Sequence, residues 1–116
     1  MGFDDMEKIN TIWMDGEYVD WEDATVHVLT HSLHYGTGVF EGARCYDTEK
    51  GPAIFRWEEH LDRLYASARP LDLEIDHDRA ELTEATTTLI DEQDLVSCYI
   101  RPLVFYGYGQ LGVSPG

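Results

Sequence analysis

The sequence contains two short stretches whose side chains have the types and spacing needed to bind an organic acid. Residues 38–46 are rich in residues typical of strands, so Phe40, Gly42 and Arg44 are expected on one face of a strand. Tyr99 and Arg101 are also two residues apart in an apolar stretch, which places both on one face. Because an arginine can hold a carboxylate through two parallel hydrogen bonds, the pattern predicts an apolar pocket backed by an anion-binding group.

Simpler structural interpretations of the same residues stay open at this point. A strand glycine marks the close approach of a ligand, but it also marks a bulge, so Gly42 fits a half-buried edge strand too. Tyr99 and Arg101 are also compatible with a plain surface on which the guanidinium stacks on the ring. Arg63, between apolar positions of a predicted helix, is compatible with a solvated arginine near Glu59.

Histidines and cysteines offer two further kinds of chemistry. His27, His31 and His34 are spaced so that one helix face could present them to a metal. No nearby carboxylate or cysteine completes such a set and glycines follow at once, so we expect these histidines at a turn, bonded to the backbone. Cys45 and Cys98 lie in apolar strand patterns, which predicts small buried side chains in a reducing compartment and no disulfide framework.

Four segments together resemble the N-terminal part of branched-chain amino acid aminotransferases. In order they are HYGTGVFEGARCY, EEHLDRL, YIRPLVF and GQLGV, and their separations match the family closely from about Trp13 to the end. These are fold type IV enzymes that use pyridoxal 5′-phosphate (PLP). D-amino acid aminotransferases and aminodeoxychorismate lyases share this fold type, but FEGARCY with YIRP resembles the branched-chain group more. A non-catalytic acidic module that binds a small anion or a partner is the alternative from another class.

The resemblance implies roles for individual residues. In the family, the arginine that matches Arg63, within an H-x-x-R segment, holds the PLP phosphate. Tyr99 contacts the α-carboxylate of the substrate, and Arg101 with Tyr35 receives the side-chain carboxylate of glutamate. The substrate-binding residues implied are Tyr35, Phe40, Gly42, Arg44, Tyr99, Arg101 and Val113. Of these, Tyr35 and Val113 reach toward the site of a partner subunit, which implies a homodimer or a larger homo-oligomer.

The resemblance also implies a reaction that needs a lysine, and this chain has no suitably placed one. The amino group moves between leucine, isoleucine or valine and 2-oxoglutarate, and a lysine must hold the PLP and move the proton. The chain contains only Lys8, in a tail expected to be loose at 1–10, and Lys50, in an expected turn. We therefore expect no catalytic residue here: 11–106 form a small domain, 107–116 begin an interdomain loop, and the lysine belongs to a second, absent domain. The chain alone is expected to be inactive.

The charge balance restricts the partners of the protein. The chain has 23 acidic and 8 basic residues, a net charge of −15, so we expect it to repel nucleic acids and anionic membranes. Its hydrophobic fraction of 43% argues for a packed domain. An acidic, lysine-poor surface fits a halophilic source, with a merely acidic mesophilic protein as the alternative. The first ten residues contain no apolar run, so no signal peptide or membrane span is expected and the cytoplasm is predicted.

The elements that must position these side chains form an α+β pattern, an antiparallel sheet with two helices. A hairpin is expected at 12–19, with its turn at Asp15 and Gly16. A second hairpin joins the strand at 38–46 to a strand at 53–56 through the loop 47–52. Apolar residues at helical spacing predict helices at 57–69 and 79–92, the second capped by Asp76 or Asp78. A strand is expected at 96–106, with Pro102 at an edge or a bulge.

Overall fold

The computed structural model describes residues 9–106, which begin with the expected hairpin. Strand β1 (Thr11–Met14) pairs antiparallel with β2 (Glu17–Asp20), and a short 3-10 turn, η2 (Trp21–Asp23), follows. Asp15 and Gly16 join the strands with φ values of 52° and 86°. Positive φ at both positions is the conformation that a two-residue hairpin turn requires, and Asp-Gly adopts it readily. The predicted turn is therefore confirmed.

The two long strands expected at the centre of the domain are each broken once. The first divides into β3 (Gly38–Phe40) and β4 (Ala43–Thr48), and the second into β6 (Cys98–Ile100) and β7 (Leu103–Phe105). Strand β3 pairs with β7, and β4 pairs with β6, both antiparallel. The two breaks face each other, since the Glu41 amide donates to the Pro102 carbonyl at 3.1 Å. Pro102 has no amide hydrogen for a ladder, which accounts for the interruption that its position predicts.

The second hairpin differs from the expectation. Strand β5 covers Gly51–Ile54 and not 53–56, and its pairing with β4 begins at Thr48 and Gly51, so the turn contains only Glu49 and Lys50. Gly51 has a φ of 102°, which favours glycine and lets the chain reverse sharply. The strands lie in the order β5-β4-β6, so β5 is an outer strand, where a proline at position 52 costs no inner ladder bond.

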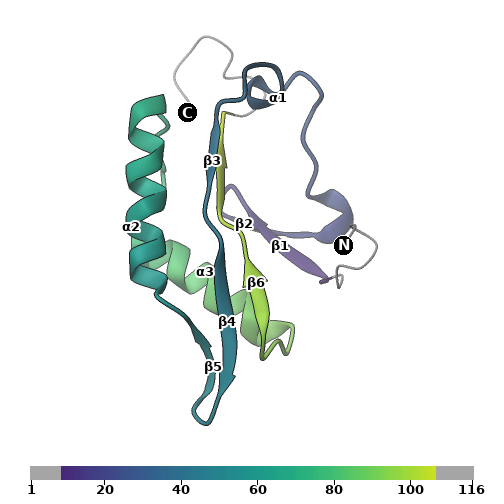
Figure 1. Ribbon diagram of the computed structural model, residues 1–116. Helices are drawn as coiled ribbons and strands as arrows, with labels where there is room; N and C mark the ends of the chain where they lie inside the picture. The colour runs from purple at the N-terminus through teal and green to yellow at the C-terminus, as the bar shows by residue number, and fades with distance from the viewer. Residues whose placement is uncertain (1–8, 107–116) are drawn as a thin grey trace, which may run out of the picture.

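Both predicted long helices are present. Helix α2 (Trp57–Ala68) ends in the 3-10 turn η3 (Arg69–Leu71), and α3 (Arg79–Glu92) begins with a capping box between Asp78 and Glu81. A third helix, α1 (His31–Tyr35), is only five residues long. Helix α2 lies along β3 and β4, while α3 passes behind the lower part of the sheet (Figure 1). No helix within residues 9–106 has the length and apolarity that crossing a bilayer would need.

The core lies between these helices and the sheet. Ala43, Trp57 and Leu61 form its centre, and Ile54, Leu82 and Ile100 pack against them. Leu61 and Leu64 are each 1% exposed, so the predicted apolar face of α2 is the buried one. The Trp57 indole donates to the Thr83 hydroxyl at 2.9 Å, which satisfies the polar atom of a buried ring and links α2 to α3.

Candidate functional site

The residues predicted to form a pocket come together on one surface of the sheet. The guanidinium carbon of Arg101 lies 4.4 Å from the centre of the Phe40 ring, and its Nη2 donates to the Tyr99 hydroxyl at 2.8 Å. The guanidinium carbon of Arg44 lies 5.8 Å from the centre of the Tyr99 ring. Alternation along each strand places the members of each pair on one face, and the β3–β7 and β4–β6 pairings bring the pairs together. We call Phe40, Gly42, Arg44, Tyr99 and Arg101 the sheet-face cluster.

Gly42 provides the space that Tyr99 occupies. A Cβ built at residue 42 would stand 2.2 Å from the Tyr99 hydroxyl oxygen and 3.0 Å from its Cζ. No side chain larger than hydrogen fits there while the ring keeps its position. The strand is interrupted at this residue, and the missing side chain leaves the space that the Tyr99 ring fills.

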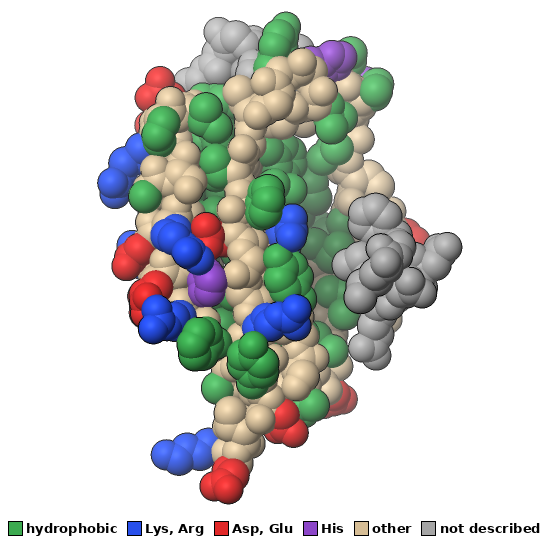
Figure 2. All heavy atoms as spheres, in the orientation of Figure 1, with side chains coloured by type: hydrophobic (Ala, Val, Ile, Leu, Met, Phe, Trp, Pro, Cys, Tyr) green, Lys and Arg blue, Asp and Glu red, His purple; other side chains and the backbone are tan. Residues whose placement is uncertain are grey.

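The sheet-face cluster combines exposed apolar surface with positive charge. Phe40 is 56% exposed, Tyr99 49%, and the neighbouring Leu103 58%. Figure 2 shows hydrophobic side chains gathered over the central strands with Lys and Arg side chains between them. A surface of this kind offers dispersion contacts to an apolar group and a charge-assisted hydrogen bond to a carboxylate. The Arg101 guanidinium lies between the two rings, so both kinds of contact are available at one place.

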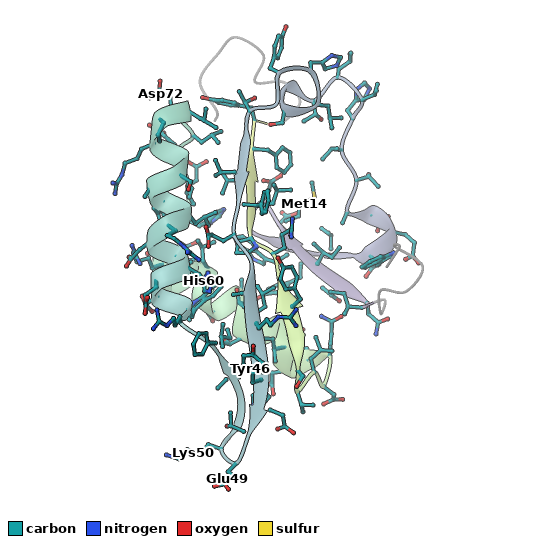
Figure 3. The ribbon with its side chains drawn as sticks, viewed as in Figure 1. Met14, Tyr46, Glu49, Lys50, His60 and Asp72 are labelled. Atoms are coloured by element: carbon teal, nitrogen blue, oxygen red, sulfur yellow. The ribbon has the colours of Figure 1, made fainter. Side chains whose placement is uncertain are left out.

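Arg63 belongs to a second group of side chains, between α2 and the sheet. Its Nη2 donates to Glu41 Oε1 at 2.9 Å, and His60 Nδ1 lies 3.0 Å from the same carboxylate oxygen. The Glu41 side chain is only 14% exposed, whereas that of Arg63 is 64% exposed. Figure 3 shows His60 on α2, on the side of the helix that faces the strands. The guanidinium is thus fixed at one nitrogen and open to solvent at the others.

Sequence patterns did not predict Glu41 and His60 as site residues. Glu41 follows Phe40 and points to the opposite side, so the alternation that selects the sheet-face cluster leaves it out. Its contacts with His60 and Arg63 depend on where α2 lies against β3, and spacing alone does not fix that. The pairing of His60 with Arg63 at i and i+3 on one helix is the only local signal.

The other residues that the sequence predicts to have a binding role lie apart from the sheet-face cluster or outside the described residues. Tyr35 lies at the end of α1 and is 69% exposed. Its ring is tilted relative to that of His34, with the two ring centres 6.4 Å apart. Val113 lies outside the described residues. His27 Nδ1 accepts from the Leu29 amide at 3.0 Å, and His34 Nε2 donates to the Val28 carbonyl at 2.9 Å. The predicted hydrogen bonds to the backbone are therefore present for His27 and His34, although His34 lies in helix α1 and not in a turn.

Of the two lysines in the chain, Lys50 is the one within residues 9–106. It lies in the turn between β4 and β5, at the tip of the hairpin, and its side chain points away from the domain (Figure 3). Lys8 lies outside the described residues. Lys50 is therefore remote from both the sheet-face cluster and Arg63.

Comparison with protein-family models identifies the class of protein that this fold and site define. The family described as amino-transferase class IV matches residues 38–116, which is more than half of the chain. The chain therefore belongs to the class IV aminotransferase family.

The individual relatives are branched-chain-amino-acid aminotransferases. The chain is 53% identical over 107 residues to the Pseudomonas aeruginosa enzyme, and 50% identical over 109 residues to the Escherichia coli enzyme. These matches cover 92% and 94% of the chain but 35% of each relative. The chain thus spans about 35% of the length of the curated relatives that it matches.

Solved structures agree with the sequence relatives. The crystal structure of the Escherichia coli branched-chain amino acid aminotransferase matches with a TM-score of 0.87 and 50% identity, over 94% of this chain and 36% of that one. A branched-chain amino acid aminotransferase from T.th., complexed with N-(5′-phosphopyridoxyl)-L-glutamate, gives the same TM-score of 0.87 and 50% identity, over 95% and 37%. Another structure of that protein holds 4-methylvaleric acid. The predicted α+β fold is confirmed by these matches.

Proposed function

We propose that this chain forms the substrate side-chain pocket of a PLP-dependent branched-chain-amino-acid aminotransferase. The observation that carries the proposal is the position of Arg101, with its guanidinium carbon 4.4 Å from the Phe40 ring centre and its Nη2 bonded to Tyr99. An enzyme that moves an amino group between leucine, isoleucine or valine and 2-oxoglutarate must accept an apolar side chain in one half-reaction and a carboxylate in the other. Phe40 suits the first and Arg101 the second.

Each residue of the sheet-face cluster then has a task that follows from its chemistry. Tyr99 presents a hydroxyl toward the α-carboxylate, and Arg44, beside the Tyr99 ring, adds positive charge on the same side. Gly42 leaves room for Tyr99 and so lets its hydroxyl lie against the strand. We extend the proposal to Tyr35 and Val113 as residues that reach the site of a second subunit in a homodimer or larger homo-oligomer.

Arg63 is the residue that suits the phosphate of PLP. Glu41 occupies Nη2, and the other guanidinium N–H groups of this mostly exposed side chain are available to phosphate oxygens. The donor set therefore fits an anion at this position. When bound, PLP takes the amino group from the amino acid and returns it to the 2-oxo acid. The matched structures with a phosphopyridoxyl-glutamate compound and with pyridoxamine 5′-phosphate support the use of PLP by similarity.

The lysine that holds PLP is proposed to lie in the part of the enzyme that this chain does not cover. Lys50 at the hairpin tip is too remote to supply it, and the relatives are almost three times as long as the matched region. We therefore propose that the chain alone does not transaminate. We also propose a cytoplasmic location. The net charge of −15 supports a halophilic source.

Other functions considered from the sequence have less support. D-amino acid aminotransferases and aminodeoxychorismate lyases share the fold type, but the relatives at 50% identity and above are branched-chain enzymes. A non-catalytic acidic module would use the sheet-face cluster for a small anion, and it would bind leucine no better than alanine. Binding of 4-methylvaleric acid by a relative favours an apolar substrate side chain.

The test replaces Arg101 with methionine in the full-length enzyme and measures each half-reaction by single-turnover kinetics. We expect the half-reaction with glutamate to slow about tenfold to a hundredfold, because a buried carboxylate loses a charge-assisted hydrogen bond of about 1.5–3 kcal/mol. The half-reaction with leucine should change little, because its side chain needs no countercharge.

The matched control is R56M, which removes a surface arginine that forms an ion pair with Glu59, away from the sheet-face cluster. It should leave both half-reactions unchanged. Equal losses with glutamate and leucine in R101M would contradict the proposal and assign Arg101 to the α-carboxylate or to the fold.

A further inference from the structure

The two cysteines of the chain face each other across a pair of strands. Cys45 of β4 and Cys98 of β6 are directly opposite in the antiparallel register, and both are free thiols. Facing residues in such a pair have Cα atoms about 4.5–5.5 Å apart, within the roughly 4.4–6.8 Å that a disulfide spans. Directly opposed side chains also share one face of the sheet. The backbone therefore already meets the main geometric requirement for a bond between them.

Only one of the two thiols can be reached from solvent. Cys45 is 2% exposed, and its Sγ lies 3.9 Å from the Val96 carbonyl oxygen. Cys98 is partly exposed. Burial, together with the adjacent Cys45 thiol, raises the pKa of Cys98. Cys98 is thus mostly protonated at neutral pH, and in a reducing medium the pair rests as two thiols.

We propose that Cys45 and Cys98 form a reversible cross-strand disulfide. The Cys98 thiolate attacks a low-molecular-weight disulfide, forms a mixed disulfide and releases one thiolate of the reagent. The Cys45 thiolate then attacks the Cys98 sulfur and displaces the second. In total, the two protein thiols lose two protons and two electrons, and the reagent disulfide is reduced to two thiols.

The geometry also explains why the bond would be reversible. Facing Cβ atoms in a sheet stand about 4.5–5.5 Å apart, whereas a disulfide prefers roughly 3.5–4.5 Å. Closing the bond draws β4 and β6 together and stores strain, which makes the disulfide easier to reduce. Arg44 and Tyr99 form the next facing pair in the same register, so the bond forms one residue from the sheet-face cluster.

The experiment uses the full 116-residue chain in buffered molar KCl, treated with oxidised glutathione and then with dithiothreitol. We expect intact mass to fall by two hydrogen atoms in most molecules, and non-reducing peptide maps to link the segments that contain Cys45 and Cys98. Dithiothreitol should restore the original mass. Because the chain contains only two cysteines, the mass change is unambiguous.

Two comparisons keep the result interpretable. In C98S and C45A, the remaining cysteine should yield at most a glutathione adduct and no loss of two hydrogens. A urea-unfolded sample tests whether the reagent oxidises the thiols without the fold. The proposal is overturned if the folded chain shows only glutathione adducts, disulfide-linked dimers or no change, whatever the unfolded sample does.

Discussion

At the scale of single residues, Gly42 is the position where a methyl group has the most specific consequence. We expect G42A to push the Tyr99 ring outward, because the new Cβ would stand 2.2 Å from its hydroxyl oxygen. Tyr99 is about half exposed and can move, so the free energy of unfolding should fall by only about 1 kcal/mol. Denaturant unfolding gives the energy, and the ring resonances of Tyr99 report its displacement.

The control for this prediction is a double-mutant cycle with Y99A. Without the ring, G42A has nothing to displace, so its cost should nearly vanish in that background. A cost of equal size with and without the ring would show that the backbone at residue 42, and not the tyrosine, resists the methyl group.

The sequence predicts the sheet-face cluster well because period-two alternation is a local property. Phe40 and Arg44 share a face, as do Tyr99 and Arg101, and the resemblance to the family indicates that the two pairs belong together. The contacts of Arg63 were not predictable in this way. They depend on the position of α2 against β3, which places Glu41 and His60 within 3.0 Å of each other. Such contacts are set by packing, which no spacing rule encodes.

At the scale of elements, the buried face of α2 carries much of the stability. Leu61 is 1% exposed and packs with Ala43 and Trp57, so L61A should cost about 2–5 kcal/mol through lost contacts and a residual cavity. L33A is the matched control, since Leu33 is also helical but 62% exposed, and it should change stability by about 0.5 kcal/mol or less. Denaturant midpoints of the two variants test this, and similar losses would contradict it.

Helices were easier to predict than strand boundaries. Apolar spacing and the capping box at Asp78 define α2 and α3 locally, and both begin where expected. The strands break opposite each other at residues 41–42 and 101–102, where Pro102 has no amide hydrogen to donate to the ladder. Across the break the partner of the first strand changes from β7 to β6, and that of the second from β4 to β3. The tight turn at Glu49 and Lys50 was missed because glycine and proline at 51 and 52 are typical of loops. Their roles as strand residues depend on β5 being at the edge.

At the scale of the whole molecule, the net charge of −15 predicts a strong dependence of stability on salt. Like charges repel over about 10 Å at 0.1 M salt but only about 3 Å at 1 M. Self-repulsion therefore weakens the fold most at low ionic strength. The midpoint of thermal unfolding should rise from low to molar KCl. A flat or falling midpoint would remove the argument for a halophilic source.

A variant with less charge sharpens that test. Asp47, Glu49 and Glu74 are exposed and belong to none of the ion pairs seen in residues 9–106. Changing them to D47N, E49Q and E74Q removes three negative charges without breaking such a pair. This variant should show a smaller rise in midpoint between low and molar KCl than the original chain.

The pairing of β3 with β7 and of β4 with β6 has a consequence for how the protein is made on the ribosome. Gly38 pairs with Phe105, and Ala43 with Ile100, so the central strands emerge long before their partners. Protein synthesis adds roughly 5–20 residues per second, so the edge of β3 at Val39 and Phe40 stays unpaired for several seconds. Helix α2 is made within that interval, and in the finished fold its Trp57 and Leu61 pack against Ala43. Any translation pause before residue 105 therefore prolongs the time for which the edges of β3 and β4 are unpaired, and an unpaired strand edge is prone to aggregation.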